Sequence, residues 1–313
     1  MAGMNRVLVV GLVFFIAAIP LIPSIDRKVD ATLAAATVLL LGLYIRLRKT
    51  PGLGRTPLDA PALALLVAAG LATIVSVDPR GSFFPSSLRG EGWLTFAAYI
   101  IAGLAATRLE RRAVGPLMMS ALAGGSVVGL ITLAQYYGLG VNAWLGIDLP
   151  VGHLDRMPGT LGNAFFLGGY TLLVLPVGVA SAALSGEHKT WWLSAVASTL
   201  VFAALAASQT RIAWAAAVAA GALLAWVLPR SRQTSRRLVT LAAIFAVTGL
   251  IMAVTNPYIS LGRRAASTFG DEDSSMRQRL YVWKHTLPMI AERPLLGWGF
   301  GTLLGRFRDV GSP

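Results

Sequence analysis

The sequence predicts an all-α membrane protein: a polytopic helical bundle of about nine transmembrane helices, followed by an amphipathic helix outside the cytoplasm. Hydrophobic residues make up 55% of the 313 residues, and charged residues only 13%. Soluble proteins have about 25% charged residues, so this chain falls outside their range. Long apolar stretches also recur along the chain. Cysteine is absent, which excludes disulfides, thiolate metal sites and cysteine nucleophiles.

Nine apolar stretches have about the length of a transmembrane helix, which needs roughly 20 mostly apolar residues. We interpret the first as a retained membrane helix, because no small-residue cleavage signal follows it. Only residues 208–211 separate the seventh stretch from the eighth, which predicts a tight helical hairpin. The nine ranges are 7–25, 29–45, 58–77, 93–107, 114–137, 163–184, 191–207, 211–228 and 238–256.

The positive charges predict the orientation of the bundle. With the N-terminus in the cytoplasm, thirteen arginines and lysines fall in the inner loops and six in the outer loops, which is the bias expected of cytoplasmic loops. The net charge of +13 is therefore mainly a topology signal and does not indicate nucleic acid binding. The inner set is Arg6, Arg46, Arg48, Lys49, Arg55, Arg108, Arg111, Arg112, Lys189, Arg230, Arg232, Arg236 and Arg237, and the outer set is Arg27, Lys28, Arg80, Arg89, Arg156 and Arg211.

Three of the outer arginines are candidate anion ligands. Arg89 and Arg156 each precede an apolar stretch, and Arg211 lies at the tip of the predicted hairpin. A charge at that depth is costly unless it is paired, and no acidic residue lies in the middle of any predicted span. Each arginine alone is explained by snorkelling or local pairing. Together with Arg277 and Arg279 they predict a diphosphate site, since guanidinium groups bind phosphates through bidentate hydrogen bonds.

The segment after residue 256 contains a predicted amphipathic helix over 275–292. Ser275 and Gln278 have the spacing of a capping box, which favours a helix start there. Apolar residues recur at steps of three and four and share one face, with cationic residues off it. Pro294 and a glycine turn over 297–301 end the helix, and such a turn lets a backbone approach a ligand closely. The apolar face comprises Met276, Leu280, Trp283, Leu287 and Ile290, and the turn contains Gly297, Gly299 and Gly301.

Metal and cofactor chemistry has no support in the sequence. The acidic run over 271–273 is typical of a helix N-terminus, and neither a GxSxG nor a Walker pattern is present. We therefore expect no metal and no cofactor. His285 lies one turn from Tyr281, so it is either a base or an ordinary interfacial histidine. The three histidines, which form no HExxH motif, are His153, His188 and His285.

Four segments together resemble the O-antigen ligase and polymerase superfamily, which comprises integral membrane enzymes that use polyprenyl-diphosphate-linked glycans. The fourth segment has the family's arginine four residues before a tryptophan, then a proline and a GxGxG turn, at Arg279, Trp283 and Pro294. The family's arginine at the start of the eighth span falls on Arg211. The segments are SSLRGEGWLTFAAYI (86–100), RMPGTLGNAFFLGGYTLLVLP (156–176), SQTRIAW (208–214) and RLYVWKHTLPMIAERPLLGWGFGT (279–302).

The resemblance implies metal-independent transfer of a glycan from an undecaprenyl-diphosphate-linked donor to lipid A core, another glycan or a protein. The place would be the outer face of the inner membrane of a Gram-negative bacterium, and membrane lipid is a further partner. Arg211 and Arg279 would stabilise the leaving diphosphate as catalytic residues. Arg89, Arg156 and Arg277 would help to bind it. Structural support is expected from Asn163, Trp283, Gly297, Gly299 and Gly301.

The resemblance also has a gap. In the family, the catalytic histidine opens a motif beyond the glycine turn, and no such motif occurs before Pro313. We therefore expect an N-terminal fragment with a transmembrane bundle over 1–256 and an incomplete periplasmic segment over 257–313, inactive alone but with much of the donor site. A transporter or flippase of a lipid-linked or anionic substrate and a non-catalytic membrane scaffold are the alternatives.

Overall fold

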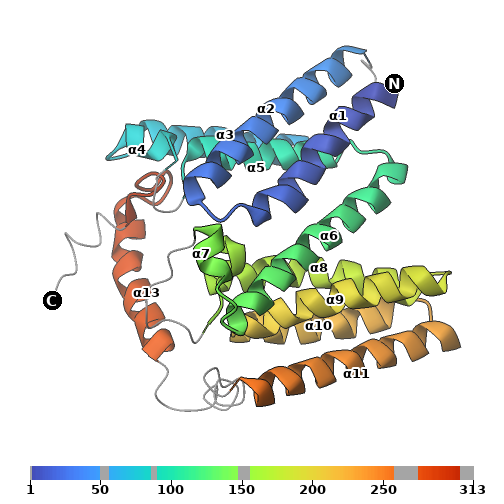
Figure 1. Cartoon of the computed structure of the whole chain (residues 1–313). Coiled ribbons are helices and arrows are strands. Elements are labelled where there is room, and N and C mark those ends of the chain that lie inside the picture. The colour runs from blue at the N-terminus through green and yellow to red at the C-terminus, as the bar shows by residue number, and fades with distance from the viewer. Residues whose placement is uncertain (1, 50–55, 86–89, 147–155, 257–273, 304–313) are drawn as a thin grey trace. The chain divides into compact units, whose positions relative to one another are not determined.

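The computed structural model describes residues 2–49, 56–85, 90–146, 156–256 and 274–303, and every regular element within them is helical (Figure 1). This agrees with the predicted all-α class. The elements are α1 (Ala2–Val13), η1 (Phe14–Ala18), η2 (Ile19–Leu21), α2 (Ile25–Lys49), α3 (Asp59–Ile74), α4 (Pro79–Phe83), α5 (Trp93–Ala106), α6 (Arg111–Tyr136), α7 (Val141–Leu145), η3 (Gly159–Leu161), α8 (Ala164–Leu184), α9 (His188–Ala207), α10 (Arg211–Val227), α11 (Arg232–Thr255) and α13 (Ser274–Glu292).

Helical structure occurs at each of the nine ranges that the sequence predicts as spans. Five of the described helices are long and apolar enough to cross a membrane, namely α2, α6, α8, α9 and α11. Four further apolar helical stretches are shorter: Arg6–Leu21, α3, α5 and α10. The chain is therefore a polytopic helical membrane protein, whereas the predicted number of about nine crossings exceeds the five that meet the length criterion.

The chain forms two compact units, each described here by itself. Unit 1 contains Met1–Phe15, Ile25–Ala113 and Asp271–Pro313, and unit 2 contains Ile16–Ser24 and Val114–Gly270. The two units are defined by which segments of the chain pack together, and this packing does not show on which side of a membrane a segment lies. The division into a bundle over 1–256 and a periplasmic segment over 257–313 therefore stays a prediction.

Unit 1 is organised around α5. This helix packs against α2 and α3, and α1 packs against α2. At one end of α5 the indole N–H of Trp93 donates to the Leu66 carbonyl of α3, at 3.3 Å. Just after the other end, Arg108 donates to both carboxylate oxygens of Asp59, at 2.7 and 2.8 Å. Both ends of the α3–α5 pair are thus fixed by side chains.

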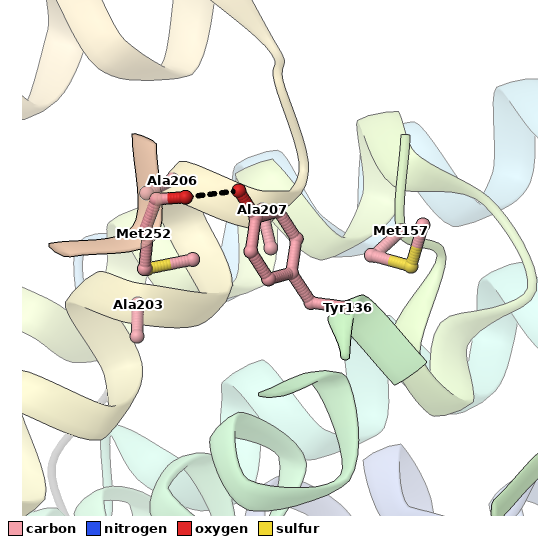
Figure 2. Packing of buried hydrophobic residues seen from close by; sticks show 6 residues of the cluster. All are labelled: Tyr136, Met157, Ala203, Ala206, Ala207 and Met252. Atoms are coloured by element: carbon pink, nitrogen blue, oxygen red, sulfur yellow. Dashed lines mark hydrogen bonds between the residues drawn. The ribbon is translucent and has the colours of Figure 1, made fainter. Parts of the chain in front are cut away.

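Unit 2 is organised around α8, which packs most extensively against α9 and also carries α10 and α11. One hydrophobic cluster surrounds the buried side chain of Tyr136, at the end of α6. Figure 2 shows the Tyr136 hydroxyl directed at the Met252 carbonyl of α11, to which it donates at 2.8 Å. The amide of Asn256 donates in turn to the Tyr136 carbonyl, at 2.6 Å. These two bonds connect the end of α11 to the end of α6.

The hairpin predicted between the seventh and eighth spans is only partly present. The chain does turn between α9 and α10 within three residues, 208–210, but α10 then packs more extensively on α8 than on α9. Gly168 permits this close approach, because a Cβ there would lie only 3.0 Å from the Thr210 Cβ and 3.1 Å from the Ala213 Cβ. Small residues at helix contacts are typical of membrane proteins.

The helix predicted over 275–292 corresponds to α13, but its predicted apolar face is not the buried one. Met289 is only 2% exposed, although it lies off that face. The glycine turn that follows α13 folds back onto the helix, since the Trp298 indole N–H donates to the Met289 carbonyl at 3.0 Å. The side chain of Met276 lies outside the described part. The exposed members of the predicted face are Leu280 (53%), Trp283 (60%), Leu287 (65%) and Ile290 (54%).

Candidate functional site

The turn between α9 and α10 is the centre of the candidate site in unit 2. Its three residues are polar and buried: Ser208, Gln209 and Thr210 are 0%, 3% and 5% exposed. Gln209 has a φ of 47°, a left-handed conformation that is uncommon for a residue other than glycine. Within a membrane such polar groups need partners in the protein, because water is absent there. The Ser208 hydroxyl donates to the Leu205 carbonyl at 2.7 Å, which satisfies part of this requirement.

Arg156 binds to this turn from a segment 52 residues earlier in the chain. Its Nε donates to the Ser208 carbonyl at 3.2 Å, and its Nη2 donates to the Thr210 hydroxyl at 3.0 Å. The adjacent Met157 N–H donates to the Ala207 carbonyl at 3.1 Å. The fold therefore places the Arg156 charge on the turn that leads into Arg211. Arg156 also acts as a structural anchor of that turn, a role that the sequence did not predict.

Thr210 connects the same turn to the start of α8. Its hydroxyl donates to the Ala164 carbonyl at 3.0 Å while it accepts from Arg156. Asn163 is the N-cap of α8, since its Oδ1 accepts from the Phe165 N–H at 2.8 Å. Asn163 thus caps α8, and its expected support of the donor site stays a prediction. Two of the four sequence segments, 156–176 and 208–214, are thus joined into one structure.

Arg211 is the first residue of α10 and is partly buried, with its Nε shielded from solvent. A helix N-terminus has exposed N–H groups and the positive end of the helix dipole, both of which favour an anion. Arg156 adds a second guanidinium group to the same turn. The turn thus carries the guanidinium group of Arg156 and leads directly into Arg211 at a helix N-terminus, a set of groups suited to a phosphate or diphosphate.

Gln135 supports the Arg156 segment and was not recognised from the sequence. Its amide nitrogen donates to the Gly159 carbonyl at 3.1 Å and to the Asn142 side-chain oxygen at 2.8 Å. The side chain is 5% exposed. A polar amide within the apolar stretch 114–137 was the available signal, because such groups in membrane helices usually make specific hydrogen bonds.

The glycine turn of unit 1 is held by two buried serines. The Ser76 hydroxyl donates to the Trp298 carbonyl and the Ser82 hydroxyl to the Phe300 carbonyl, each at 2.9 Å. Gly299 has a φ of 96°, and a Cβ on it would lie 2.2 Å from the Ser76 Oγ. Only glycine fits this position without displacing Ser76. The other two predicted glycines also have a positive φ, which is 64° for Gly297 and 72° for Gly301.

The glycine turn also joins two of the sequence segments. The ring of Phe300 lies against that of Phe96 on α5, with centroids 5.5 Å apart. Arg293, which was not singled out from the sequence, lies over the Trp298 ring at 4.3 Å and donates to the Val75 carbonyl at 3.2 Å. Its position five residues before a tryptophan was the available signal. Segments 86–100 and 279–302 thus come together within unit 1, as 156–176 and 208–214 do within unit 2.

The remaining predicted residues do not join a described site. Arg89 lies outside the described residues, and so do the side chains of Arg277 and Arg279, although both belong to α13. Trp283 is exposed, so its expected support of Arg279 stays a prediction. His285 donates from its Nδ1 to the Tyr281 carbonyl at 2.8 Å. The gathering of all five arginines around one diphosphate therefore also stays a prediction.

Among the residues that the structure describes, no group of three or more His, Cys, Asp or Glu side chains could hold a metal ion. Residues 196–310 match the family model described as O-Antigen ligase. The matched range includes Arg211, α13 and the glycine turn. Neither the curated proteins nor the solved structures gave a match.

Proposed function

Residues 196–310 place the chain in the O-antigen ligase and polymerase superfamily, as the resemblance predicted, and on this premise we propose a specific reaction for it. The reaction is the transfer of a glycan from an undecaprenyl-diphosphate-linked donor to an acceptor hydroxyl at the outer face of the inner membrane, and this chain contributes residues of the donor site. The acceptor is lipid A core, another glycan chain or a protein. In the proposed orientation the N-terminus is cytoplasmic and α13 is periplasmic.

One observation carries the proposal: Arg156 is bonded to the turn from which Arg211 begins α10. Two arginines from separate segments therefore share one turn. Positive charge at a helix N-terminus in an apolar bundle favours an anionic ligand, and a diphosphate matches guanidinium groups in geometry and charge.

The proposed reaction assigns these arginines to the leaving group. The acceptor oxygen attacks the anomeric carbon of the glycan, the bond from that carbon to the diphosphate oxygen breaks, and the bonding electrons go to the diphosphate. A base takes the acceptor proton. The negative charge that develops on the diphosphate oxygen is stabilised by guanidinium groups fixed before the reaction begins. Because fixed charges provide this stabilisation, the step runs without a metal ion.

The full proposed donor site includes residues beyond the described turn. Arg279 contributes a second catalytic charge from α13, and Arg89 and Arg277 bind the diphosphate with it.

The affinity of the detergent-purified chain for undecaprenyl diphosphate tests the proposal. Arg211→Ala and Arg279→Ala should each weaken binding about tenfold or more, because each removes a charged hydrogen-bond donor that the proposal assigns to the diphosphate. Arg211→Lys should recover only part of the affinity, since lysine keeps the charge but not the planar fork.

Arg232→Ala is the matched control. Arg232 is the first residue of α11, as Arg211 is of α10, but it is exposed and belongs to the inner set of charges. Its removal should leave the affinity unchanged. Equal affinity in the wild type, Arg211→Ala and Arg279→Ala would contradict the proposed site.

A further inference from the structure

The first five residues of α9 contain two adjacent tryptophans, at the end opposite the α9–α10 turn. The helix has 20 residues, so its two ends are about 30 Å apart. Trp191 is buried and packs with Leu241 of α11, whereas Trp192 is 48% exposed. The indole N–H of Trp192 donates to the Nε2 of His188, at 2.8 Å. An exposed tryptophan at the end of a membrane helix is typical of the boundary between bilayer and water.

Cationic side chains gather at the same end of unit 2. Arg237 of α11 donates from its Nη1 to the carbonyl of Ser185, the C-cap of α8, which places its guanidinium group at the loop before α9. Lys189 is exposed and lies one turn before Trp192 on the same side of α9. The two segments that meet here hold four cationic residues and one acidic residue, so the local charge is positive. These residues are Lys189, Arg232, Arg236, Arg237 and Glu187.

An apolar groove of about 200 Å³ runs along α9 from Trp192, with Ile244 of α11 at its side. Its polar groups are already bonded, since the Thr199 hydroxyl donates to the Ala195 carbonyl at 2.8 Å and the Trp192 indole to His188. A complete small-molecule site has roughly 300–1,000 Å³, so this groove suits part of a larger apolar molecule. The α9 residues that line it are Trp192, Ala195, Val196, Thr199 and Leu200.

The cations and the groove lie on the same side of each helix. Lys189 and Val196 are seven residues apart on α9, and Arg237 and Ile244 are seven apart on α11. Seven residues return to within about 20° of the same direction around a helix. In each pair the cation is nearer the N-terminus and the apolar residue lines the groove. Two neighbouring helices therefore both present positive charge first and an apolar path after it.

We infer that this face of α9 and α11 binds an anionic phospholipid, with its phosphate at Lys189 and Arg237 and an acyl chain in the groove. Basic pockets between helices on the cytoplasmic side of membrane proteins bind anionic lipid head groups. A guanidinium group has five N–H donors, so Arg237 can bind Ser185 and a phosphate oxygen together. A free phosphate ion does not require the groove, and a second copy of the chain does not require the cations.

This inference goes beyond the proposed glycan transfer and does not depend on it. The α9–α10 turn, to which the donor diphosphate is assigned, lies at the other end of α9. Only the choice of leaflet rests on the proposed orientation, in which the start of α9 is cytoplasmic and the phospholipid belongs to the inner leaflet.

Native mass spectrometry of the detergent-purified chain tests the inference, with phosphatidylglycerol and phosphatidylcholine of the same acyl chains as probes. Phosphatidylglycerol should bind about fivefold or more tightly, since only its head group has a net negative charge. The double variant Lys189→Gln, Arg237→Gln should reduce this preference to about twofold or less. The matched control is Arg48→Gln, Arg111→Gln, which removes two exposed charges of the inner set from other helices and should keep the preference.

Two single variants separate lipid binding from an effect on the fold, because both positions are exposed. Lys189→Glu reverses one charge and should weaken phosphatidylglycerol about fivefold while leaving phosphatidylcholine unchanged. Val196→Phe places a ring in the groove and should weaken both lipids about threefold through lost dispersion contacts. Its control is Leu193→Phe, an exposed neighbour on α9 outside the groove lining, which should bind as the wild type does.

The outcomes distinguish the possible occupants. Equal affinities for the two lipids, or a preference that the double variant retains, would contradict the inference. Competition by inorganic phosphate, with no effect of Val196→Phe, would show an ion site and no lipid site. A changed oligomeric state in Val196→Phe with unchanged lipid affinity would show an interface between copies.

Undecaprenyl diphosphate separates this inference from the proposed function. The double variant Lys189→Gln, Arg237→Gln should bind it as the wild type does, because the assigned diphosphate site is at the other end of α9. Loss of both lipids in this variant would contradict a site selective for phospholipid. If Arg211→Ala leaves the affinity for undecaprenyl diphosphate unchanged, the proposed function fails and the phospholipid site is unaffected.

Discussion

The glycine turn of unit 1 and the α9–α10 turn of unit 2 are held in different ways. The glycine turn of unit 1 is held from outside, by the hydroxyls of Ser76 and Ser82, and has no room for a side chain at Gly299. The α9–α10 turn of unit 2, residues 208–210, is here named the arginine turn: it is held by the charged side chain of Arg156 and is followed directly by Arg211. The first turn is fixed by close packing, and the second is fixed in a way that concentrates positive charge.

This difference is consistent with the proposal that the α9–α10 turn, and not the glycine turn, binds the donor. The hydroxyls of Ser76 and Ser82 donate to the Trp298 and Phe300 carbonyls of the glycine turn, and the overlap that a Cβ at Gly299 would meet explains the glycine there by packing. At the arginine turn, the Nε of Arg156 donates to a backbone carbonyl and so stabilises the turn. The same guanidinium group places positive charge next to the N-terminus of α10. A change at the first turn should therefore affect stability, and a change at the second should affect ligand binding as well.

The largest effect on stability is expected from Gly299→Ala. The added Cβ would meet the Oγ and Cβ of Ser76 at 2.2 and 2.4 Å, and alanine is strained at a φ of 96°. Strain and overlap together should cost about 3 kcal/mol. Thermal unfolding of the purified protein, followed by tryptophan fluorescence, measures the loss.

Gly301→Ala is the control for this variant. Gly301 also has a positive φ, of 72°, but a Cβ on it meets nothing within 4 Å. It should therefore cost only about 1 kcal/mol, the backbone term alone. Equal losses in the two variants would show that overlap with Ser76 is not what selects glycine at position 299.

A smaller loss is expected from Thr210→Val at the arginine turn. Valine keeps the shape but removes the hydroxyl that accepts from Arg156 and donates to the Ala164 carbonyl. Buried groups left without these bonds should cost about 1–3 kcal/mol. Unlike Gly299→Ala, this variant should also weaken undecaprenyl diphosphate binding, because Arg156 loses one of its anchors. Thr210→Ser retains the hydroxyl and should restore both properties, and a failure to do so would contradict the anchoring role.

The smallest effect is expected from Arg293→Met in unit 1. The guanidinium lies over the Trp298 ring at 4.3 Å, but Arg293 is exposed. An exposed cation–π contact contributes about 0.5–1 kcal/mol. Because this arginine serves packing, its loss should lower the melting temperature slightly and leave the affinity for undecaprenyl diphosphate unchanged. A loss of affinity comparable to that of Arg211→Ala would show that the glycine turn takes part in binding.

The sequence predicted the helical fold and the approximate positions of the helices, because these depend on composition and on local helix signals. The apolar stretches located the helices, and the charge of Arg211 at the start of a span marked it as a candidate ligand. The same patterns predicted about nine spans, and this number stays a prediction, because α3, α5 and α10 are apolar but only 16, 14 and 17 residues long. Hydropathy measures composition over a window and does not locate where a helix ends.

The links between distant segments could not be predicted. Arg156 donates to a backbone carbonyl, and every residue type provides such an acceptor, so no sequence signal identified Ser208 as its partner. The left-handed φ of Gln209 could not be predicted either, because such a conformation is usually recognised in a sequence by a glycine, and this position has a glutamine. On α13 the three-and-four spacing defined an apolar face, but Met289, off that face, is the buried residue, because the glycine turn folds back onto it.

The central claim is that the arginine turn is an anion site at the outer face of the membrane, and cysteine labelling tests it most directly. The chain has no cysteine, so single cysteines can be introduced. Gly162 and Gly186 flank the two ends of α8, and both are exposed with open space around a Cβ. In spheroplasts, a membrane-impermeant maleimide should label Gly162→Cys at once and Gly186→Cys only after permeabilisation. Labelling of Gly186→Cys in intact spheroplasts, with Gly162→Cys protected, would place the arginine turn in the cytoplasm and contradict the account.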